Sequence, residues 1–534
     1  MRDTRRNFLK TAMVGAAGGM SAGRGWAGSI ESQPCAAQCG SVYQGPPQQQ
    51  GNNLNLIVIV SDTFRYDNLA CYGPKWLESL ETPHLDAFAE HSVVFRDAYS
   101  EALPTIPLRR TLYTGRRGVP AIYFPQQEPV QFPGWHPLFN EDVTLSETLL
   151  AAGYLTALFS DVYHQFKPGR NFQRGFHPYR WIRGQEWDDY GTVPRGLSDV
   201  SEIVPEEYLA RFPGLHRNLS QYKANRTLWN EQGDSLAQIV AQTAMGWLRQ
   251  NYQQQPFYLH VELFSPHEPW DPPQPFLEKY LPNAAGPSFL EPPYDTVPLL
   301  TEIKARFRAN YAGAVSCVDH WVGSLLELVG QLGLYENSVL VFTSDHGTML
   351  GEHEQFLKGP DKLRGQVTHI PLLIRTPAAQ YAGRKASGFA QPPDVMPTVL
   401  HLLGLKPPGR VTGANLWPLV TGESAPARDV VVQGYGWVAA VRNREWSYTQ
   451  IWKPEAAPEK FHVHPGAPLA VYKPQLYNLE KDPRELTDVA DQYPDVARQM
   501  SAELKEYIAS GEGMACGSFN AKPSLHPGEG LYLK

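Results

Sequence analysis

Short runs of apolar and β-branched residues, separated by segments with helical spacing, constrain the fold of this chain most strongly. A run that is apolar at almost every position predicts a strand buried on both faces, as strands are in a parallel sheet covered by helices. Strands that alternate with helices along a chain are typical of an α/β fold. We therefore expect a large domain with a mostly parallel central sheet flanked by helices. The expected strands are residues 54–60, 154–159, 257–264, 338–343 and 369–374, and the expected helices are residues 83–90, 145–152, 235–252, 305–334 and 395–403.

The length of the chain and a change in composition near residues 421–429 indicate a second, smaller unit. At 534 residues the chain exceeds what one simple core usually holds. Residues 29–53 are rich in Gly, Gln, Pro and Ser and predict a linker. We expect residues 54–425 to form the large domain and residues 426–534 a small C-terminal α+β subdomain. Its expected elements are strands at 429–434, 437–442 and 446–452 and a helix at 494–508.

The N-terminus has the pattern of an export signal. Residues 4–10 read Thr-Arg-Arg-Asn-Phe-Leu-Lys and precede a short apolar stretch. This pattern is typical of a twin-arginine signal, which we place at residues 1–28. The alternative is a basic tail before a disordered segment, but the paired arginines and the apolar stretch together favour export. No later run approaches the roughly 20 apolar residues that a bilayer span needs. We expect a periplasmic or secreted mature protein without a membrane anchor.

Charge and cysteine content narrow the class of protein further. The formal net charge is -7, and no basic run follows the first residues, so we expect no nucleic-acid partner. Of the five cysteines, Cys35 and Cys39 are close enough to form a small disulfide loop in an oxidising compartment. Cys71 and Cys317 are expected to be small buried apolar residues instead.

Polar residues follow the expected strands at the points where these strands end. Asp62 follows the first strand, and Asp345 and His346 follow the fourth. Because the carboxyl ends of parallel strands meet at one edge of a sheet, these side chains are expected to converge there. Carboxylate and imidazole groups together suit a divalent cation. Taken singly, an aspartate at a strand end is as often a turn or helix-capping residue.

Several motifs, in the same order along the chain, resemble those of bacterial sulfatases in the alkaline phosphatase superfamily. Residues 105–116 read Thr-Ile-Pro-Leu-Arg-Arg-Thr-Leu-Tyr-Thr-Gly-Arg. This segment is similar to the family signature, which has Cys or Ser, any residue, Pro, any residue and Arg, followed by Leu-x-Thr-Gly-Arg. Only the first position differs in type. The resemblance runs from about residue 54 to 508. Its other segments are residues 62–67, 71–73, 82–86, 266–269, 344–347, 351–353, 358–359, 394–398 and 476–483.

The resemblance implies a metal-dependent hydrolase of small-molecule esters with one divalent metal ion. The implied metal ligands are Asp62, Asp345 and His346, with Thr105 as a further ligand. Thr63 stands where the family usually has a second aspartate, and it is a weaker ligand. With one carboxylate fewer, metals other than calcium become plausible, and magnesium, manganese and zinc stay open.

The same resemblance assigns the remaining catalytic roles. Arg109 would hold the nucleophile and the anionic oxygens of the substrate, and Lys358 would contact these oxygens as a cation. His267 matches the residue that protonates the leaving group. Outside their motifs, these residues would be read as an exposed arginine, a surface lysine and a turn histidine.

Thr105 departs from the family in a way that affects the chemistry. Formylglycine is an aldehyde made from a primary thiol or alcohol, whereas oxidation of threonine would give a ketone, so no formylglycine is expected. A hydrated aldehyde expels sulfate by returning to the carbonyl, and a sulfated threonine has no such route. A phosphorylated threonine can be hydrolysed by attack at phosphorus. The sequence therefore favours phosphate or phosphonate esters over sulfate esters.

A second departure follows residues 153–156. Sulfatases usually have Gly-Lys-Trp-His there, and this chain has Ser160, Asp161, Val162, Tyr163 and His164 instead. A sulfate-binding lysine is replaced by an acid. Asp161 and His164 are candidate substrate-binding residues that either activate a water molecule or merely cap and line the end of the strand.

Two other functions remain open from the sequence. A covalent intermediate on Thr105 would also permit transfer of a phospho group to an alcohol. A protein that kept the shape of the site after losing formylglycine would bind its ligand without turnover, although the retained metal, arginine, histidine and lysine positions speak against this. The sequence does not determine the oligomeric state.

Overall fold

A computed structural model describes residues 51–121, 133–167, 169–194, 197–294, 298–424, 426–452, 461–462, 469–470, 473–511 and 517–518. The expected export signal, most of the expected linker, and Cys35 and Cys39 lie outside these residues. All described residues belong to one compact unit, Ser41–Lys534.

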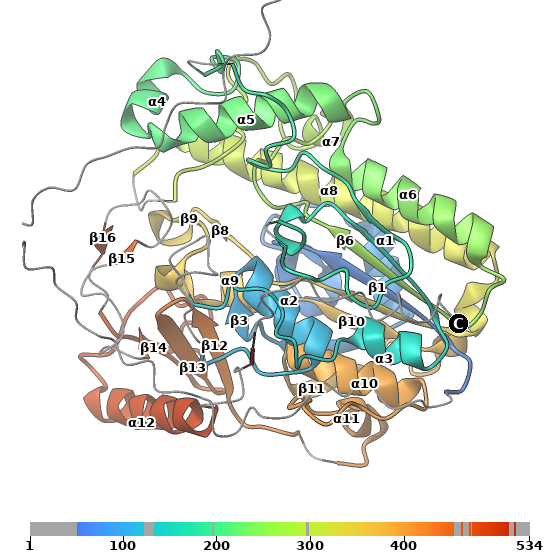
Figure 1. The fold of residues 1–534 in the computed structure, drawn as a ribbon. Helices are drawn as coiled ribbons and strands as arrows, with labels where there is room; N and C mark the ends of the chain where they lie inside the picture. The colour runs from blue at the N-terminus through green and yellow to red at the C-terminus, as the bar shows by residue number, and fades with distance from the viewer. Residues whose placement is uncertain are drawn as a thin grey trace, which may run out of the picture. The chain divides into compact units, whose positions relative to one another are not determined.

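The central sheet has eight strands in the order β11-β2-β10-β7-β1-β6-β4-β5 (Figure 1). Strand β1 lies within it and pairs in parallel with β6 and β7, while β6 pairs in parallel with β4. Every residue of β1 is buried, as its apolar run predicts. The expected α/β fold with a mostly parallel sheet is confirmed. These strands are β1 (Asn55–Ser61), β4 (Leu155–Ser160), β5 (Tyr179–Trp181), β6 (Phe257–Leu263) and β7 (Ser338–Thr343).

One half of the sheet contains a strand that runs in the opposite direction. Strand β10 (Leu372–Arg375) is antiparallel to both β7 and β2 (Val93–Ala98). Strand β11 (Lys385–Ala390) closes this edge and is parallel to β2. The sequence predicts a strand from residue 369, but β10 begins only after Pro371, which has no backbone N–H to donate.

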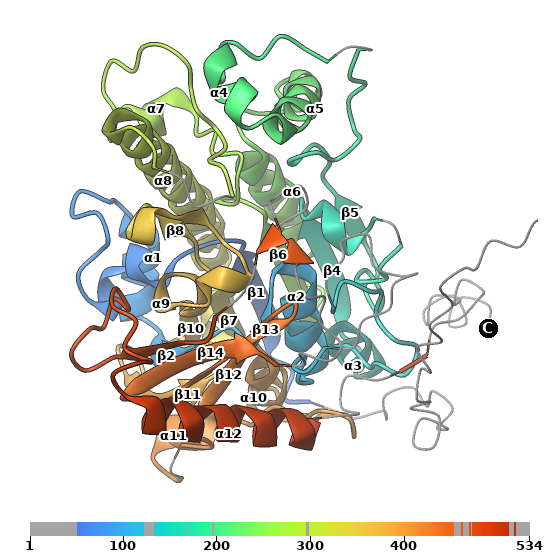
Figure 2. The ribbon, with the colours of Figure 1, turned by 90° about the vertical axis from the view of Figure 1, so that its left-hand side faces the viewer.

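Successive residues of β1 point to opposite faces of the sheet and enter two different apolar cores. Ile57 and Ile59 pack in the core beneath α1, α6 and α8, whereas Leu56, Val58 and Val60 pack in the core beneath α2, α3, α10 and α11. Figures 1 and 2 show these two helix layers on either side of the sheet. The helices are α1 (Pro83–Glu90), α2 (Thr105–Thr114), α3 (Leu145–Ala151), α6 (Leu236–Asn251), α8 (Thr301–Gln331), α10 (Val395–Leu402) and α11 (Trp417–Thr421).

The predicted helices begin where the sequence supplies suitable first residues. Helix α3 follows a capping box in which Thr144 and Glu147 satisfy each other's backbone N–H groups. Ser235 accepts a hydrogen bond from the backbone N–H of Gln238 at the start of α6. Pro83 occupies the first position of α1, where a missing N–H costs nothing.

A smaller five-stranded sheet has the order β17-β14-β13-β12-β3. Each of its four C-terminal strands is antiparallel to its C-terminal neighbours in the sheet, and α12 packs Met500, Leu504 and Ile508 against them. The two-residue strand β3 comes from a distant part of the chain and pairs in parallel with β12. Since β3 ends two residues before α2 begins, this pairing helps to fix the start of α2. The elements are β3 (Ala102–Leu103), β12 (Val431–Tyr435), β13 (Val438–Arg442), β14 (Trp446–Ile451), β17 (Gln475–Asn478) and α12 (Pro494–Gly511).

The segment between β5 and β6 contains a helical pair that the sequence patterns do not predict. Helices α4 (Glu206–Arg211) and α5 (Gly214–Trp229) lie together at one end of the molecule (Figures 1 and 2). The buried Asn225 of α5 donates hydrogen bonds to the carbonyl groups of Glu186 and Asp188 at 3.3 and 2.8 Å. The remaining short elements are α7 (Gln274–Leu277), α9 (Gly365–Thr368), β8 (Met349–Leu350), β9 (Phe356–Leu357), β15 (Phe461–His462) and β16 (Leu469–Ala470).

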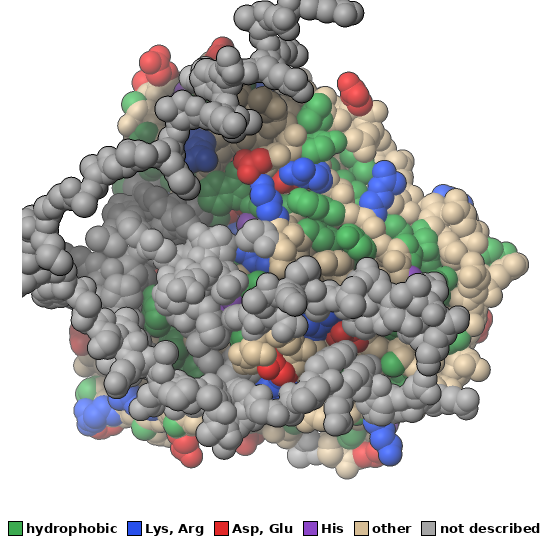
Figure 3. Space-filling model, in the orientation of Figure 1, with side chains coloured by type: hydrophobic (Ala, Val, Ile, Leu, Met, Phe, Trp, Pro, Cys, Tyr) green, Lys and Arg blue, Asp and Glu red, His purple; other side chains and the backbone are tan. Residues whose placement is uncertain are grey.

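The described surface carries both signs of charge. Figure 3 shows acidic and basic side chains interspersed on the face presented there. Among the described residues, no helix is both long enough and apolar enough to cross a membrane.

A buried ion pair joins the smaller sheet to the loop that precedes α12. On β13, Arg442 donates to both carboxylate oxygens of Glu485 at 2.7 Å, and Glu485 also accepts the N–H of Gly365 at 2.6 Å. We expect Glu485→Gln to lower the free energy of unfolding by about 3 kcal/mol, because it leaves the guanidinium buried without its counter-charge. Urea unfolding checks this result, with the exposed Glu480→Gln as control. An equal midpoint for both variants would contradict it.

Candidate active site

The structure brings three of the predicted metal ligands together at the carboxyl ends of neighbouring strands. Asp62 follows β1, and Asp345 and His346 follow β7, which pairs with β1. Each residue offers one ligand atom, and these atoms all lie within 4.8 Å of one another. All three side chains are fully buried. A group of two carboxylates and one imidazole of this kind can bind a divalent cation.

The hydrogen bonds of this group leave metal-binding atoms free. His346 Nδ1 lies 2.9 Å from the carbonyl oxygen of Gly347, which can only accept, so Nδ1 carries the ring proton. His346 Nε2 and Asp62 Oδ2 are buried and have no hydrogen-bond partner among the described residues, although Asp62 Oδ2 lies 3.1 Å from Arg109 Nη1. A backbone carbonyl that fixes the tautomer of a metal-binding histidine is common in metal sites. The donor atoms therefore fit a divalent metal.

The charges of the group also point to a cation. Burial and the neighbouring Asp345 raise the pKa of Asp62 well above its usual value. Burial opposes ionisation of Asp345 as well, but His346, Arg109 and the hydrogen bonds from Asp62 and the backbone of Thr63 together hold the pKa of Asp345 below its usual range. Burial lowers the pKa of His346 to about 4, so this imidazole is neutral at neutral pH. Without a metal, a proton on Asp62 offsets part of the negative charge of the two carboxylates. A bound cation would offset the same charge.

Thr63 contacts both carboxylates of the group. Its hydroxyl donates to Asp62 Oδ1 at 2.7 Å, and its backbone N–H donates to Asp345 Oδ1 at 2.9 Å. Its φ of 61° is in the left-handed region, which is uncommon for a β-branched residue. These contacts place Thr63 as a residue that orients Asp62 and Asp345.

Thr105 and Arg109 lie one turn apart on α2. Thr105 is the buried first residue of this helix, where the N-terminal dipole favours negative charge. Arg109 Nη1 donates to the carbonyl oxygen of Thr105 at 3.1 Å and to Asp345 Oδ2 at 2.8 Å. Arg109 Nη2 is buried and has no hydrogen-bond partner among the described residues. This N–H group is a free donor on the guanidinium whose Nη1 contacts the backbone of Thr105.

Glu262 holds the guanidinium of Arg109 and was not predicted from the sequence. Its Oε2 accepts from Arg109 Nε at 2.7 Å, while Oε1 accepts from Tyr113 and Gln165 and lies 3.0 Å from His260 Nε2. Burial opposes ionisation of Glu262, but Arg109 and His260 together outweigh it and lower the pKa of Glu262 to about 2. The sequence does carry a signal for Glu262. His260 and Glu262 are polar residues inside the apolar run of β6, and every residue of this strand is buried.

His267 and Lys358 form a second part of the site. Lys358 Nζ lies 2.7 Å from His267 Nε2 and donates to Glu268 Oε1 at 3.0 Å. His267 Nδ1 lies 2.7 Å from the carbonyl oxygen of Glu268 and therefore carries the ring proton. Burial lowers the pKa of His267 to about 4. Burial acts in the same direction on Lys358, but Glu268, Asp62 and Glu186 together outweigh it and raise the pKa of Lys358. The proton between the two groups is therefore bound to Lys358 Nζ, and His267 Nε2 accepts the hydrogen bond.

Asp161 and His164 do not contact each other. Both oxygens of Asp161 are engaged, Oδ1 by the backbone N–H of Phe264 at 2.7 Å and Oδ2 by Gln185 at 2.6 Å. Asp161 thus joins the ends of β4 and β6, and burial raises its pKa to about 6. His164 instead lies 3.3 Å from Glu186 Oε2.

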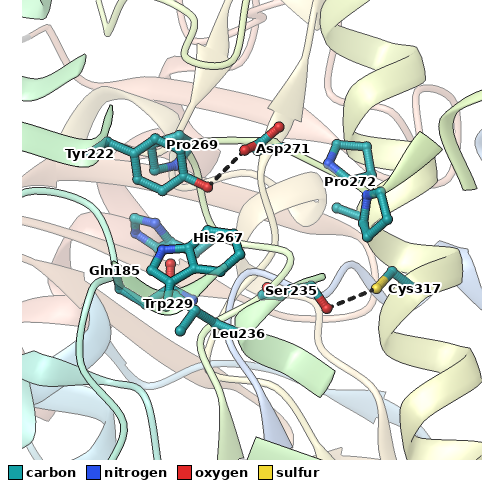
Figure 4. A pocket seen from close by; sticks show the side chains of 13 residues that line it. Gln185, Tyr222, Trp229, Ser235, Leu236, His267, Pro269, Asp271, Pro272 and Cys317 are labelled. Carbon is teal, nitrogen blue, oxygen red and sulfur yellow. Dashed lines mark hydrogen bonds between the residues drawn. The ribbon is translucent and has the colours of Figure 1, made fainter. Parts of the chain in front are cut away.

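A small cavity of about 30 Å³ lies beside His267 (Figure 4). Polar and apolar side chains share its wall, where Tyr222 donates to Asp271 at 3.1 Å. A cavity of this size holds roughly two water molecules. Other lining residues are Gln185, Trp229, Ser235 and Cys317.

Comparison with known proteins agrees with this geometry. The arylsulfatase of Clostridium perfringens is 25% identical over 85% of this chain and 92% of its own length. The multifunctional alkaline phosphatase superfamily protein PehA of Trinickia caryophylli is 24% identical over 82% of this chain and 91% of its own length. The phosphonate monoester hydrolase of Agrobacterium radiobacter shares the fold, with a TM-score of 0.62 and 23% identity over 86% of this chain and 96% of that one. The sulfatase family model matches residues 54–405, more than half of the sequence. This protein therefore belongs to the sulfatase family, within the alkaline phosphatase superfamily, and is a hydrolase of that family.

Proposed function

We propose that this protein hydrolyses phosphate or phosphonate esters with Thr105 as the nucleophile and one divalent metal as cofactor. The observation that carries the proposal is the position of Thr105, buried at the N-terminus of α2 and one turn before the free Nη2 donor of Arg109. Helix N-termini and arginine groups both stabilise the anionic oxygens of a phosphoryl group.

The chemistry of threonine supports phosphorus over sulfur. A sulfated threonine has no aldehyde hydrate through which to expel sulfate, whereas a phosphorylated threonine is released by attack of water at phosphorus. The name of one similar protein, a phosphonate monoester hydrolase, agrees with this preference. Sulfate esters are the alternative, because another relative is an arylsulfatase.

The groups of the site that donate or accept a proton fit a reaction with two displacement steps. In the first, Thr105 Oγ1 enters as the deprotonated alkoxide and forms a bond to phosphorus, the bond to the leaving oxygen breaks, and the leaving oxygen takes a proton from the Lys358–His267 pair. In the second, water attacks phosphorus and returns one proton to this pair, the bond from phosphorus to Oγ1 breaks, and Thr105 is released as the alkoxide. Arg109 Nη2 contacts a phosphoryl oxygen in both steps.

Asp62, Asp345 and His346 are the residues that would hold the metal. When bound, a divalent metal lowers the pKa of a hydroxyl group that it contacts and offsets negative charge on the phosphoryl group. Calcium prefers an all-oxygen set, whereas imidazole suits zinc and similar transition metals. We propose zinc or manganese for this site.

We also propose export through the twin-arginine pathway, on the basis of the motif at residues 4–10. Replacement of Arg5 and Arg6 by lysine should keep the protein in the cytoplasm, because this pathway reads the arginine pair. Cell fractionation followed by immunoblotting measures the distribution. Unchanged export of the double variant would contradict the proposal.

The nucleophile is tested with a matched set of aryl esters, namely sulfate, phosphate monoester, phosphate diester and phosphonate monoester. We expect turnover of phosphorus esters by the metal-loaded protein and a loss of at least about 10⁴-fold in kcat for Thr105→Ala. Thr105→Ser keeps a hydroxyl at this position and should retain measurable activity. Multiple turnovers of the sulfate ester would refute the preference for phosphorus, and silence on every ester would favour transfer or binding.

Metal binding is expected to weaken as the pH falls. The pKa of Asp62 is raised, and a proton and a metal compete for the same carboxylate, so affinity should drop as the pH falls through that pKa. Calorimetric titration of EDTA-treated protein with Zn²⁺ or Mn²⁺ should give one ion per chain. Asp62→Asn should weaken binding by more than about 100-fold. The control is Asp495→Asn, whose side chain is 88% exposed. Equal affinities for both variants would place the metal elsewhere.

A further inference from the structure

A carboxylate outside the sulfatase-like motifs faces His267 at the ring nitrogen that Lys358 does not contact. Glu186 Oε1 lies 3.4 Å from His267 Nδ1, and the two residues are 81 positions apart in the sequence. We propose that Glu186 is a positioning residue, which stabilises the charged form of His267 while a proton passes between Lys358, the leaving group and water. This inference rests on the proposed function.

The loop that carries Glu186 is held firmly in place. Arg183 pairs with Asp188 through two hydrogen bonds of 2.9 and 2.6 Å, which close the loop on itself. Asn225 of α5 also donates hydrogen bonds to two backbone carbonyl groups of the loop and so fixes the loop against this helix. Glu186 has a φ of 42°, in the left-handed region that a residue with a Cβ rarely adopts. Such backbone strain persists only where the surrounding contacts over-determine the conformation, and it concentrates at functional sites.

The carboxylate of Glu186 is also fixed at its second oxygen. Oε2 accepts a hydrogen bond from the hydroxyl of Tyr163 at 2.8 Å and lies 3.3 Å from His164 Nε2. Tyr163 and His164 stand at the place where sulfatases usually have Gly-Lys-Trp-His, so the departure from the family there is linked to Glu186. Oε1 is the oxygen that remains for His267.

The charges around His267 show what Glu186 contributes. The charged groups that face the ring are Glu186, Glu268 and Lys358, and Phe264 stacks on its plane at 4.1 Å. Burial and Lys358 disfavour the imidazolium, whereas Glu268 and Glu186 favour it. When Nε2 takes a proton from Lys358 or from water, the ring becomes positive while Nδ1 still donates to the carbonyl group of Glu268. Glu186 then supplies a negative charge beside that ring.

A second metal ion bound by Glu186, His267 and Glu268 is less favourable than the positioning role of Glu186. Glu186, His267 and Glu268 place one ligand atom each within 4.8 Å of one another, an arrangement that a metal also uses. However, the buried ammonium of Lys358 already contacts both His267 and Glu268. This positive charge at the edge of the group repels a metal ion, so the geometry favours proton transfer.

The test compares Glu186→Gln with the wild type on two esters of the same acid, one with a 4-nitrophenoxide and one with a phenoxide leaving group. A poor leaving group needs protonation as it departs, and a good one does not. We expect kcat/KM to fall by about 10- to 100-fold for the phenyl ester and by less than about 3-fold for the 4-nitrophenyl ester. A merely structural role would lower both values equally.

The matched control is Asp189→Asn on the same loop, whose side chain is 75% exposed and pairs with Lys167 at the surface. It should leave both rates unchanged. Tyr163→Phe releases Glu186 without removing its charge and should give an intermediate effect on the phenyl ester alone. Circular dichroism and thermal melting check that each variant is folded.

Equal losses on both esters, or no loss on either, would overturn the assignment of Glu186 while leaving Thr105 as nucleophile intact. If the wild type turns over no ester, the proposed function fails, and the assignment is tested by NMR titration of ¹³C-histidine-labelled protein. The signal of His267 is identified by its absence from His267→Gln. Its titration midpoint should be lower in Glu186→Gln than in the wild type, and an unchanged midpoint would refute the proposal.

Discussion

The buried guanidinium of Arg109 is the interaction on which the site depends. It contacts Asp62 after β1, Glu262 on β6 and Asp345 after β7, so one side chain joins three neighbouring strands to α2. Three acids face one arginine. Burial and then the neighbouring Asp345 raise the pKa of Asp62, whereas at Glu262 burial is outweighed by Arg109 and His260 together, and the pKa is lowered. A divalent cation would restore neutrality, because its two charges and that of Arg109 match the three carboxylates. The same guanidinium keeps Nη2 free beside Thr105.

The central part of the fold was readable because burial leaves a local signal. Strands β1 and β7 appear in the sequence as unbroken apolar runs, and their shared sheet edge follows from parallel pairing. The short strand β3 has no such signal, since two residues show no periodicity and their partner β12 is more than 300 positions away. Helix α5 was missed because it has only a weak apolar face. The direction of β10 depends on long-range pairing that no local pattern encodes.

The same distinction separates the site residues that were predicted from those that were missed. Asp62, Asp345 and His346 follow apolar runs, so their convergence could be expected before the structure. Glu262 was hidden inside such a run, where a carboxylate is tolerated only because Arg109 meets it. Glu186 lies in a loop whose path is set by α5, and nothing in its immediate sequence indicates that it reaches His267. For Asp161, the hydrogen bonds from Gln185 and Phe264 favour the strand-capping role over water activation.

Lys358 connects the two halves of the site. Its pKa is raised chiefly by Glu268, against the effect of burial, and next by Asp62, so its charge serves the proton-transfer half and the metal-binding half together. Of the groups it contacts, only His267 Nε2 can accept its proton as a neutral base. In the proposed mechanism, an anionic substrate beside Arg109 would add negative charge near Lys358 and hold the proton there until the leaving oxygen develops charge. In the mechanism proposed above, Thr105 takes the place of formylglycine as the group that forms the covalent bond, and the contacts of Lys358 with His267 and Glu268 supply the proton.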